Sequence, residues 1–122
     1  MDRVITFLLT AKPDAALTFY RDTLACDFLR DDGFALVFDL KGVMLRISRS
    51  PEFTPARNTV LGWECADLTA AVDALAAKGV AFTRYDGMQQ DERGIATFPN
   101  GDQVAWFSDP DGNVLSLSSH VA

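Results

Sequence analysis

A repeated order of apolar segments restricts the fold of this chain more than any other feature of its sequence. Val4–Thr10 is apolar and rich in branched side chains, which is typical of a strand, and Pro13-Asp14 then opens a helix. The same order returns in the second half, where Val60–Ala66 precedes a helix that Asp67 or Thr69 can cap. We therefore interpret the chain as two copies of one unit, each with a strand, a helix and three further strands.

The helices and the remaining strand-like segments support this repeat. Ala15-Ala16-Leu17 in the first helix aligns with Ala70-Ala71-Val72 in the second, which should stop at Gly79. The remaining strand-like segments are Phe34–Leu40, Val43–Ser48, Val80–Tyr85, Ile95–Phe98, Gln103–Ser108 and Val114–Ser118. The predicted fold class is α+β, with two βαβββ modules in one domain of 122 residues. Module 1 spans about residues 1–50, a linker about 51–59, and module 2 about 60–122.

Charge and hydropathy exclude several classes of partner. The chain carries 17 acidic and 11 basic residues and a net charge of −6, so its surface would repel a nucleic-acid backbone. Its apolar segments are shorter than the roughly 20 residues that cross a bilayer, and no signal peptide is evident. We expect a cytoplasmic protein that binds neither nucleic acid nor membrane. Cys26 and Cys65 form no close motif, so both should be reduced, partly buried and inert.

Two motifs connect the chain to a known family. Phe19–Leu24 resembles the first-helix signature of the glyoxalase/bleomycin resistance/extradiol dioxygenase (vicinal oxygen chelate) superfamily, and Val104–Leu115 resembles its last β-hairpin. The hairpin motif contains Asp109-Pro110-Asp111-Gly112, which suits a type I turn, so its own role should be structural. The resemblance covers nearly the whole chain. It implies two βαβββ modules whose mixed sheets together form a cup, a homodimer in many members, and a ligand inside the cup.

In metal-dependent members, the resemblance implies a divalent ion held by His, Gln and Glu on the first and last strands of the modules. The matching positions here are Ile5, Leu61, Ser116 and either Leu45 or Arg46. Hydrocarbon side chains offer no donor atom, a serine hydroxyl is a weak ligand, and an arginine repels a cation. The only histidine, His120, is interpreted as an exposed tail residue. We expect no metal and no other cofactor.

Polar and aromatic residues on apolar strands are the candidates for ligand binding. Trp63 is predicted to share the cup-facing side of its strand with Leu61, and either to stack on a ligand or to fill a core. Glu64 would then face the helices or a subunit interface. Arg46 could bind a ligand carboxylate or phosphate, pair with an internal acid, or lie on a sheet edge.

Two further candidates come from the second module. Either Trp106 or its neighbour Phe107 should face inward. Tyr85 leads into the polar segment Asp86–Gly94, which contains Gln90 and two glycines and is either a mobile lid or a plain solvated loop. The predicted ligand-binding residues are thus Arg46, Trp63, Tyr85, Gln90 and Trp106.

Three functional hypotheses remain open at this point. The first is metal-independent binding of a small aromatic or glycopeptide-like molecule by a homodimer. The second is an enzyme, either a lyase or isomerase of the glyoxalase type or a ring-cleaving dioxygenase, with an unrecognised metal site or acid–base work by Glu64, Arg46 or Tyr85. The third is a structural or regulatory partner without a small ligand. The sequence indicates no Ser-His-Asp or Cys-His arrangement.

Overall fold

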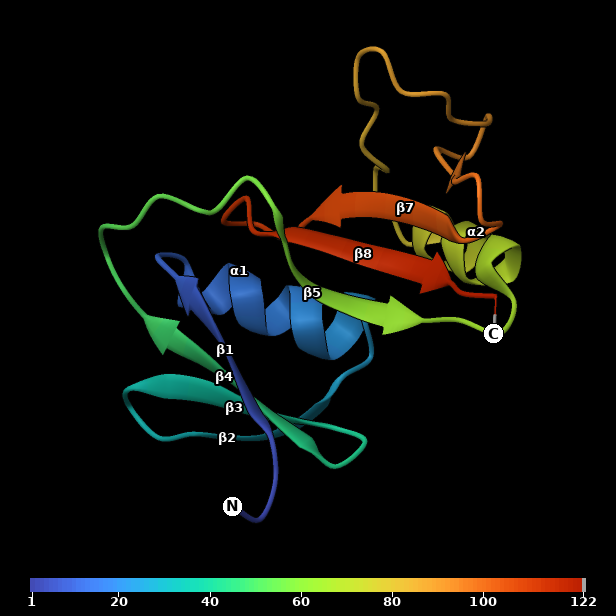
Figure 1. Cartoon of the computed structure of the whole chain (residues 1–122). Helices are drawn as coiled ribbons and strands as arrows, with labels where there is room; N and C mark the ends of the chain where they lie inside the picture. The colour runs from blue at the N-terminus through green and yellow to red at the C-terminus, as the bar shows by residue number, and fades with distance from the viewer. Residues whose placement is uncertain (122) are drawn as a thin grey trace. The chain divides into compact units, whose positions relative to one another are not determined.

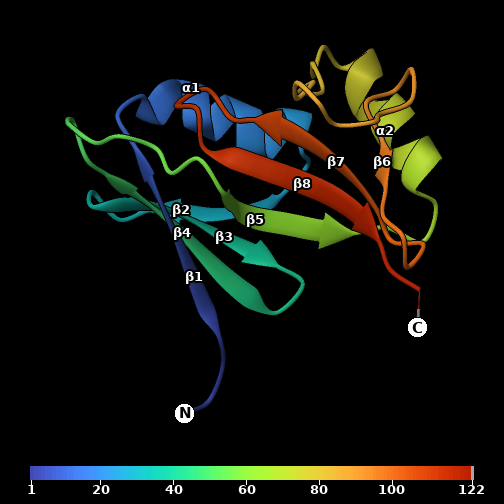
Figure 2. The ribbon, with the colours of Figure 1, turned by 45° about the horizontal axis from the view of Figure 1, so that its top comes forward.

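A computed structural model describes residues 1–121 of the chain. The chain forms two compact units, each built on a four-stranded sheet (Figures 1 and 2). The first unit contains residues 1–55 and the short segment 110–112, and the second contains 56–109 and the segment from Asn113 onward. No helix among the described residues is long and apolar enough to cross a membrane.

The first unit has the order expected of a βαβββ module. Its elements are β1 (Ile5–Thr10), α1 (Pro13–Thr18), the π-helical turn η1 (Phe19–Thr23), β2 (Asp27–Asp31), β3 (Ala35–Leu40) and β4 (Val43–Arg49). The sheet order is β1-β4-β3-β2, with β1 parallel to β4 and the other pairs antiparallel. The edge strand β2 was not predicted from the sequence. Its register shifts between Phe28 and Arg30, and its side chains are mostly exposed.

The aromatic pair of the first-helix signature packs into the core of this unit. Tyr20 is fully buried, and its ring lies 6.0 Å from that of Phe38 on β3. Phe19 meets the Tyr20 ring edge-on at 5.3 Å. On β4, the buried residues Leu45 and Ile47 point to this same core. The signature is therefore explained by packing of the helical segment on one face of the sheet.

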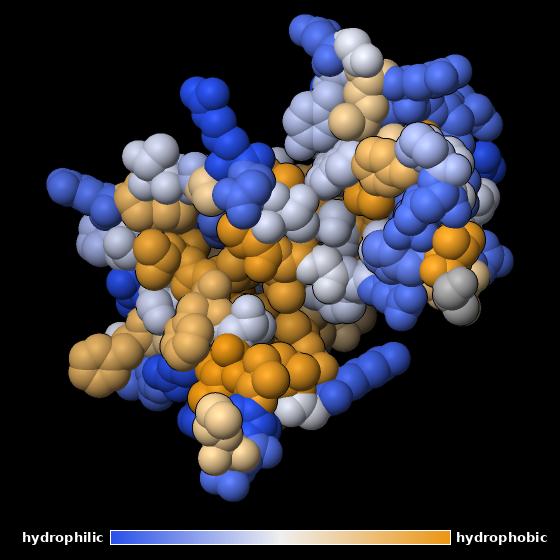
Figure 3. All heavy atoms as spheres, in the orientation of Figure 1, coloured by the Kyte–Doolittle hydropathy of each residue, from blue (hydrophilic) through white to orange (hydrophobic). Residues whose placement is uncertain are grey.

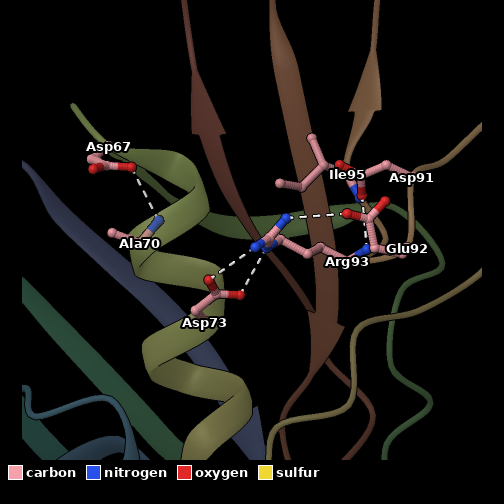
Figure 4. A network of polar contacts seen from close by, with 7 residues as sticks. All are labelled: Asp67, Ala70, Asp73, Asp91, Glu92, Arg93 and Ile95. Carbon is pink, nitrogen blue, oxygen red and sulfur yellow. Dashed lines mark hydrogen bonds and ion pairs between the residues drawn. The ribbon is translucent and has the colours of Figure 1, made fainter.

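The second unit repeats the order. Its elements are β5 (Thr59–Glu64), α2 (Leu68–Ala77), β6 (Ala96–Thr97), β7 (Gln103–Ser108) and β8 (Val114–Ser119). The sheet order is β5-β8-β7-β6, and β5 runs parallel to β8. Asp67 caps α2 by accepting a 3.0 Å hydrogen bond from the Ala70 amide, as Figure 4 shows. Two four-stranded mixed sheets with one helical segment each confirm the predicted fold class.

The prediction of a strand at Val80–Tyr85 is wrong. The segment is irregular, and a 2.8 Å hydrogen bond from the Thr83 amide to the Trp106 carbonyl joins it to β7. The neighbouring part of that β7 edge pairs with β6 instead, through Ala96 opposite Val104. A strand needs a partner ladder as well as branched and aromatic side chains, and β7 does not offer this segment a continuous one.

The Asp-Pro-Asp-Gly turn has a structural role, as its turn chemistry indicates. The buried Asp109 carboxylate accepts hydrogen bonds from the Asn113 amide at 3.0 Å and from its side-chain nitrogen at 2.9 Å. Asp111 belongs to the first unit. Its carboxylate accepts a 2.5 Å hydrogen bond from the Thr10 hydroxyl and a 2.9 Å hydrogen bond from the Ala11 amide. The Asp111 carboxylate therefore fixes the short connection between β1 and α1.

Both cysteines are free and partly buried. Burial raises the pKa of the Cys26 thiol to about 11 and is also the main cause of the raised pKa of Cys65. A raised pKa keeps both sulfurs in the thiol form, which is a poor nucleophile.

The hairpin between β2 and β3 should be sensitive to acid. The Arg49 guanidinium holds the pKa of Asp31 at about 2, and Arg46 does the same for Asp32. Since a lowered carboxyl pKa contributes stability that is complete above the unfolded value, this contribution is lost as the pH falls from about 4 through about 2. Arg49→Gln should therefore lower the melting temperature at pH 5 and flatten its fall between pH 4 and 2.

The measurement is the melting temperature by circular dichroism across pH 2–7. Arg57→Gln, which removes one charge from the segment before β5, is the matched control and should follow the parent curve. Identical curves for Arg49→Gln and the parent chain would contradict this account of the ion pairs.

Candidate functional site

The position of β8 between β5 and β7 decides which side chains share a face of the second sheet. Trp106 on β7 is the register partner of Ser116 on β8, which is in turn the partner of Gly62 on β5. On the opposite face, Phe107 and Leu115 are fully buried. We call the sheet face that carries Trp106 and Ser116 the open face. The residues on it are Gly62, Glu64, Val104, Trp106, Ser116 and Ser118.

The predicted orientation of Trp63 is wrong. Leu61 and Trp63 are the partners of Leu115 and Leu117, so both point to the covered face rather than to the side that carries Ser116. The register shifts between Thr59 and Leu61, and a shift of one residue sends every following side chain to the other face. For the same reason Glu64, expected against the helices or an interface, is exposed on the open face.

Three aromatic rings gather on the open face. The Tyr85 ring meets the Trp106 ring edge-on at 5.3 Å and 87°, and the Phe98 ring does so at 6.4 Å and 78°. The Trp106 indole nitrogen donates a 3.1 Å hydrogen bond to the Thr59 hydroxyl. Tyr85 and Phe98 remain 37% and 39% exposed. We call Tyr85, Phe98 and Trp106 the aromatic cluster; it brings together two of the five predicted site residues.

Phe98 was not among the predicted site residues and was only the last residue of a predicted strand. The ring belongs to the hairpin between β6 and β7, where the Phe98 amide donates a 2.8 Å hydrogen bond to the Asp102 carbonyl. Phe98 lies two residues after Ala96 of β6, so the two side chains point to the same face of the sheet. That face is also the face of Val104, the β7 partner of Ala96. An apolar residue directly before the turn Pro99-Asn100-Gly101 was the available signal.

A close contact between β5 and β8 shapes the floor of the open face. A Cβ atom placed on Gly62 would lie 2.5 Å from the Ser116 hydroxyl oxygen. Ser116 is only 8% exposed, so this part of the face is closely packed. The absence of a side chain at Gly62 is therefore what gives the Ser116 side chain its place beside Trp106.

Gln90 positions the loop that carries Tyr85. Its side-chain oxygen accepts a 2.9 Å hydrogen bond from the Tyr85 amide, and its nitrogen donates to the carbonyls of Thr83 and Gly94 at 2.9 and 2.8 Å. The structure thus directs the amide of this predicted ligand-binding residue into the loop rather than toward the Trp106 ring.

The rest of this polar segment is attached to α2. The Asp91 carboxylate accepts hydrogen bonds from the backbone amides of Arg93 and Ile95. The Arg93 guanidinium forms an ion pair with Asp73 on α2 at 2.8 Å (Figure 4). Figure 4 also shows the pair between Arg93 and Glu92, at 3.3 Å. A pocket of about 350 Å³ lies here, lined by Gln89, Gln90, Asp91, Ile95 and Thr97. Whether residues 86–94 move as a lid remains a prediction. The contacts above attach the second half of this segment to α2.

Arg46 belongs to the first unit, whereas the aromatic cluster belongs to the second. Its guanidinium pairs with Asp32 at 2.7 Å, the internal acid among the roles considered for it. Arg46 shares its sheet face with Ile5 and Phe7, while Leu45 is fully buried on the other face. The register therefore selects Arg46 over Leu45 as the residue on the side of Ile5.

The residues at the family's metal positions do not fit a divalent ion. Ile5 offers no donor atom, and the register brings it beside Met44 rather than beside a carboxylate. In the second unit, Ser116 is paired with Gly62. Across residues 1–121, no group of three or more His, Cys, Asp or Glu side chains is placed to hold a metal ion. These donor sets lack the imidazole and carboxylate ligands that such ions require.

His120 is exposed after β8, as expected of a tail residue, yet its ring has two partners that the sequence did not indicate. Its Nδ1 lies 2.9 Å from an Asp102 carboxylate oxygen, and its Nε2 lies 2.8 Å from the Ser118 hydroxyl. The hydrogen bond from His120 also lowers the pKa of Asp102, assisted by a bond from the Val121 amide. A Ser-His-Asp arrangement therefore exists, although sequence analysis indicated none.

The two sheets define the class of fold. The chain has the fold of the glyoxalase/bleomycin resistance protein/dioxygenase superfamily, as the resemblance in its two motifs implied. No protein-family model and no curated protein matches the sequence.

Several solved structures are similar over almost the full length. A superfamily member from Sphaerobacter thermophilus has a TM-score of 0.74 and 20% identity, with 98% of each chain covered. A glyoxalase/bleomycin resistance protein/dioxygenase from Nocardioides has a TM-score of 0.74 and 16% identity, over 99% of this chain and 84% of that one. Lactoylglutathione lyase from Agrobacterium tumefaciens has a TM-score of 0.72 and 18% identity, over 95% and 91%.

The contact between Gly62 and Ser116 can be tested by substitution. Gly62→Ala should destabilise the fold by about 1–3 kcal/mol, because its methyl group would overlap the Ser116 hydroxyl. Ser116→Ala in the same chain should recover a large part of that loss, since it removes the overlapping atom. Urea unfolding of the parent, the two single variants and the double variant measures the coupling. Strictly additive effects would show that the two residues do not meet.

Proposed function

We propose that this protein binds a small, flat aromatic molecule at the aromatic cluster of the second sheet, without a metal ion. The observation that carries the proposal is the gathering of three rings on a sheet face where two of them stay more than a third exposed. Grouped exposed rings are costly in water, and a flat ligand that covers them regains that free energy. Unlike a scattered exposed side chain, such a group is typical of a binding surface.

Polar groups beside the rings would orient the ligand. The Thr59 hydroxyl accepts from the indole nitrogen and keeps an oxygen lone pair and its own proton for other partners. The hydroxyls of Ser116 and Ser118 stand on the same face, together with the Glu64 carboxylate. The ligand is thus expected to be neutral or cationic, with a polar substituent on an aromatic ring.

The similar structures support a ligand of this class and keep an enzyme as the alternative. One is described as a glyoxalase/bleomycin resistance protein/dioxygenase, which favours an aromatic or glycopeptide-like ligand such as bleomycin. Another is a lactoylglutathione lyase, which keeps a metal-dependent lyase or dioxygenase as the second candidate. The donor chemistry at Ile5, Leu61 and Ser116 weighs against that second candidate. Elemental analysis of purified protein separates the two.

We further propose that the protein is a cytoplasmic homodimer. β1 is an edge strand, and its side chains Ile5, Phe7 and Leu9 lie on one sheet face at 42%, 62% and 42% exposure. Hydrophobic side chains gather on the face of the molecule shown in Figure 3. An edge strand with an exposed apolar row is suited to contact with a second copy.

Ligand binding is tested with 2-naphthol and bleomycin by calorimetry and by quenching of tryptophan fluorescence. At least one probe should bind the parent chain, and Trp106→Leu should weaken binding about 10- to 100-fold, the effect of removing one stacking ring. Trp63→Phe, which changes the tryptophan on the covered face, is the control and should keep both affinity and quenching. Equal losses in the two variants, or no binding by the parent chain, would count against the site.

Self-association is tested by sedimentation velocity. Phe7→Glu should convert a dimer to a monomer, because it puts a charge into the apolar row of β1. Phe34→Glu makes the same change at a side chain that is 80% exposed outside the strands and should leave the dimer intact. A parent chain that sediments as a monomer would refute the dimer.

A further inference from the structure

We propose that Ser118, His120 and Asp102 form an acyl-transfer site, with Ser118 as a nucleophile toward esters. The carboxylate of Asp102 can only accept, so His120 Nδ1 must donate across the 2.9 Å that separates them. A neutral imidazole with its proton on Nδ1 has an acceptor at Nε2. That nitrogen lies 2.8 Å from the Ser118 hydroxyl and is thus placed to take its proton.

The fold holds each member of this group separately. Ser118 lies on the open face of β8, and its carbonyl accepts a 2.7 Å hydrogen bond from the Cys65 amide. Asp102 closes the hairpin after β6, where its amide donates to the Asn100 side chain at 3.0 Å. Its second carboxylate oxygen accepts a 2.9 Å hydrogen bond from the Val121 amide, which holds the segment after β8, with His120, against the hairpin. Asp102 is therefore placed to orient the imidazole.

These three side chains can perform a complete acyl transfer. As the Ser118 oxygen bonds to the ester carbonyl carbon, its proton passes to His120 Nε2. The bond from that carbon to the alcohol oxygen breaks, and the departing oxygen takes the proton from His120. Water then gives a proton to His120 and attacks the acyl carbon; the Ser118 oxygen leaves and recovers that proton. The net reaction is hydrolysis of an ester to an acid and an alcohol, with Asp102 ionised throughout.

The surroundings favour a neutral aryl ester. Ser118 is two residues from Ser116 along β8, a separation of about 7 Å. Ser116 is the partner of Trp106, and the hairpin that carries Asp102 also carries Phe98. When the carbonyl carbon of an aryl ester is at Ser118, the aryl ring of the same ester is thus within reach of the aromatic cluster. Glu64, the partner of Ser118 on β5, disfavours anionic substrates.

The choice of an aromatic ester rests on the proposed ligand site, whereas the nucleophile does not. The first experiment therefore uses a non-aromatic probe, diisopropyl fluorophosphate, which bonds to an activated serine oxygen with loss of fluoride. Intact-mass and peptide analysis should find one adduct, at Ser118. The rate of labelling should fall on the order of 100-fold in His120→Ala, which removes the base. Asp102→Asn, which keeps an acceptor for the Val121 amide, should also lower it.

Ser119→Ala is the matched control because it changes the next serine of β8, which points to the other face. It should label like the parent chain, and Ser118→Ala should not label while it keeps the parent's melting temperature. No adduct in the folded parent chain, an adduct at another residue, or an unchanged rate in His120→Ala would overturn the proposal. If 2-naphthol still bound in that case, the aromatic ligand site would stand without the acyl-transfer site.

The second experiment follows hydrolysis of 2-naphthyl acetate. The parent chain should release 2-naphthol, and Ser118→Ala should reduce the rate on the order of 100-fold. Trp106→Leu should raise KM for this ester about 10-fold, whereas Ser119→Ala should keep the parent's KM. A KM unaffected by Trp106→Leu would overturn the assignment of the aryl group to the aromatic cluster.

Discussion

The second unit depends on the position of β8 between β5 and β7. Because side chains alternate along a strand, this one register separates two sets of residues. Leu115 and Leu117 join the buried core, while Ser116 and Ser118 reach the open face. The glycine at position 62 allows close approach at the centre of that face. A slip of one residue would put hydroxyls into the core and leucines at the surface, so the packing that stabilises the sheet also fixes the candidate site.

The same strand connects binding with chemistry. Ser116 is the partner of Trp106, around which the aromatic rings gather, and Ser118 is the partner of Val104 and bonds to His120. The hairpin between β6 and β7 contributes at both positions, through Phe98 and Asp102. A ring platform and a hydrogen-bonded serine thus occupy neighbouring positions on one sheet. At the positions where the resemblance implies metal ligands, Ile5, Leu61 and Ser116 offer only hydrocarbon and a serine hydroxyl, and both proposed functions rest on the chain's own side chains.

The parts of this structure that follow from local pattern could be predicted from the sequence. Helical periodicity, the Asp67 cap and turn chemistry produced the repeat of two modules and hence the fold class. The irregularity between Thr59 and Leu61 could not be predicted, because no residue type there requires it, and it reversed the assignment of Trp63. The contacts of His120 were equally hidden, since Asp102 is brought to it by a hairpin rather than by sequence spacing. Tyr85 and Trp106 were predicted from the sequence as ligand-binding residues, and the structure brings their rings into contact; only the tertiary structure adds Phe98.

The candidate site requires the Trp106 ring to lie on the open face of the second sheet. Nuclear Overhauser contacts from its indole protons, recorded on the intact chain by NMR, test this most directly. We expect contacts to the rings of Tyr85 and Phe98 and to the Thr59 side chain. Contacts instead to the methyl groups of Leu115 and Leu117 would place Trp106 in the buried core and contradict the register from which the account is built.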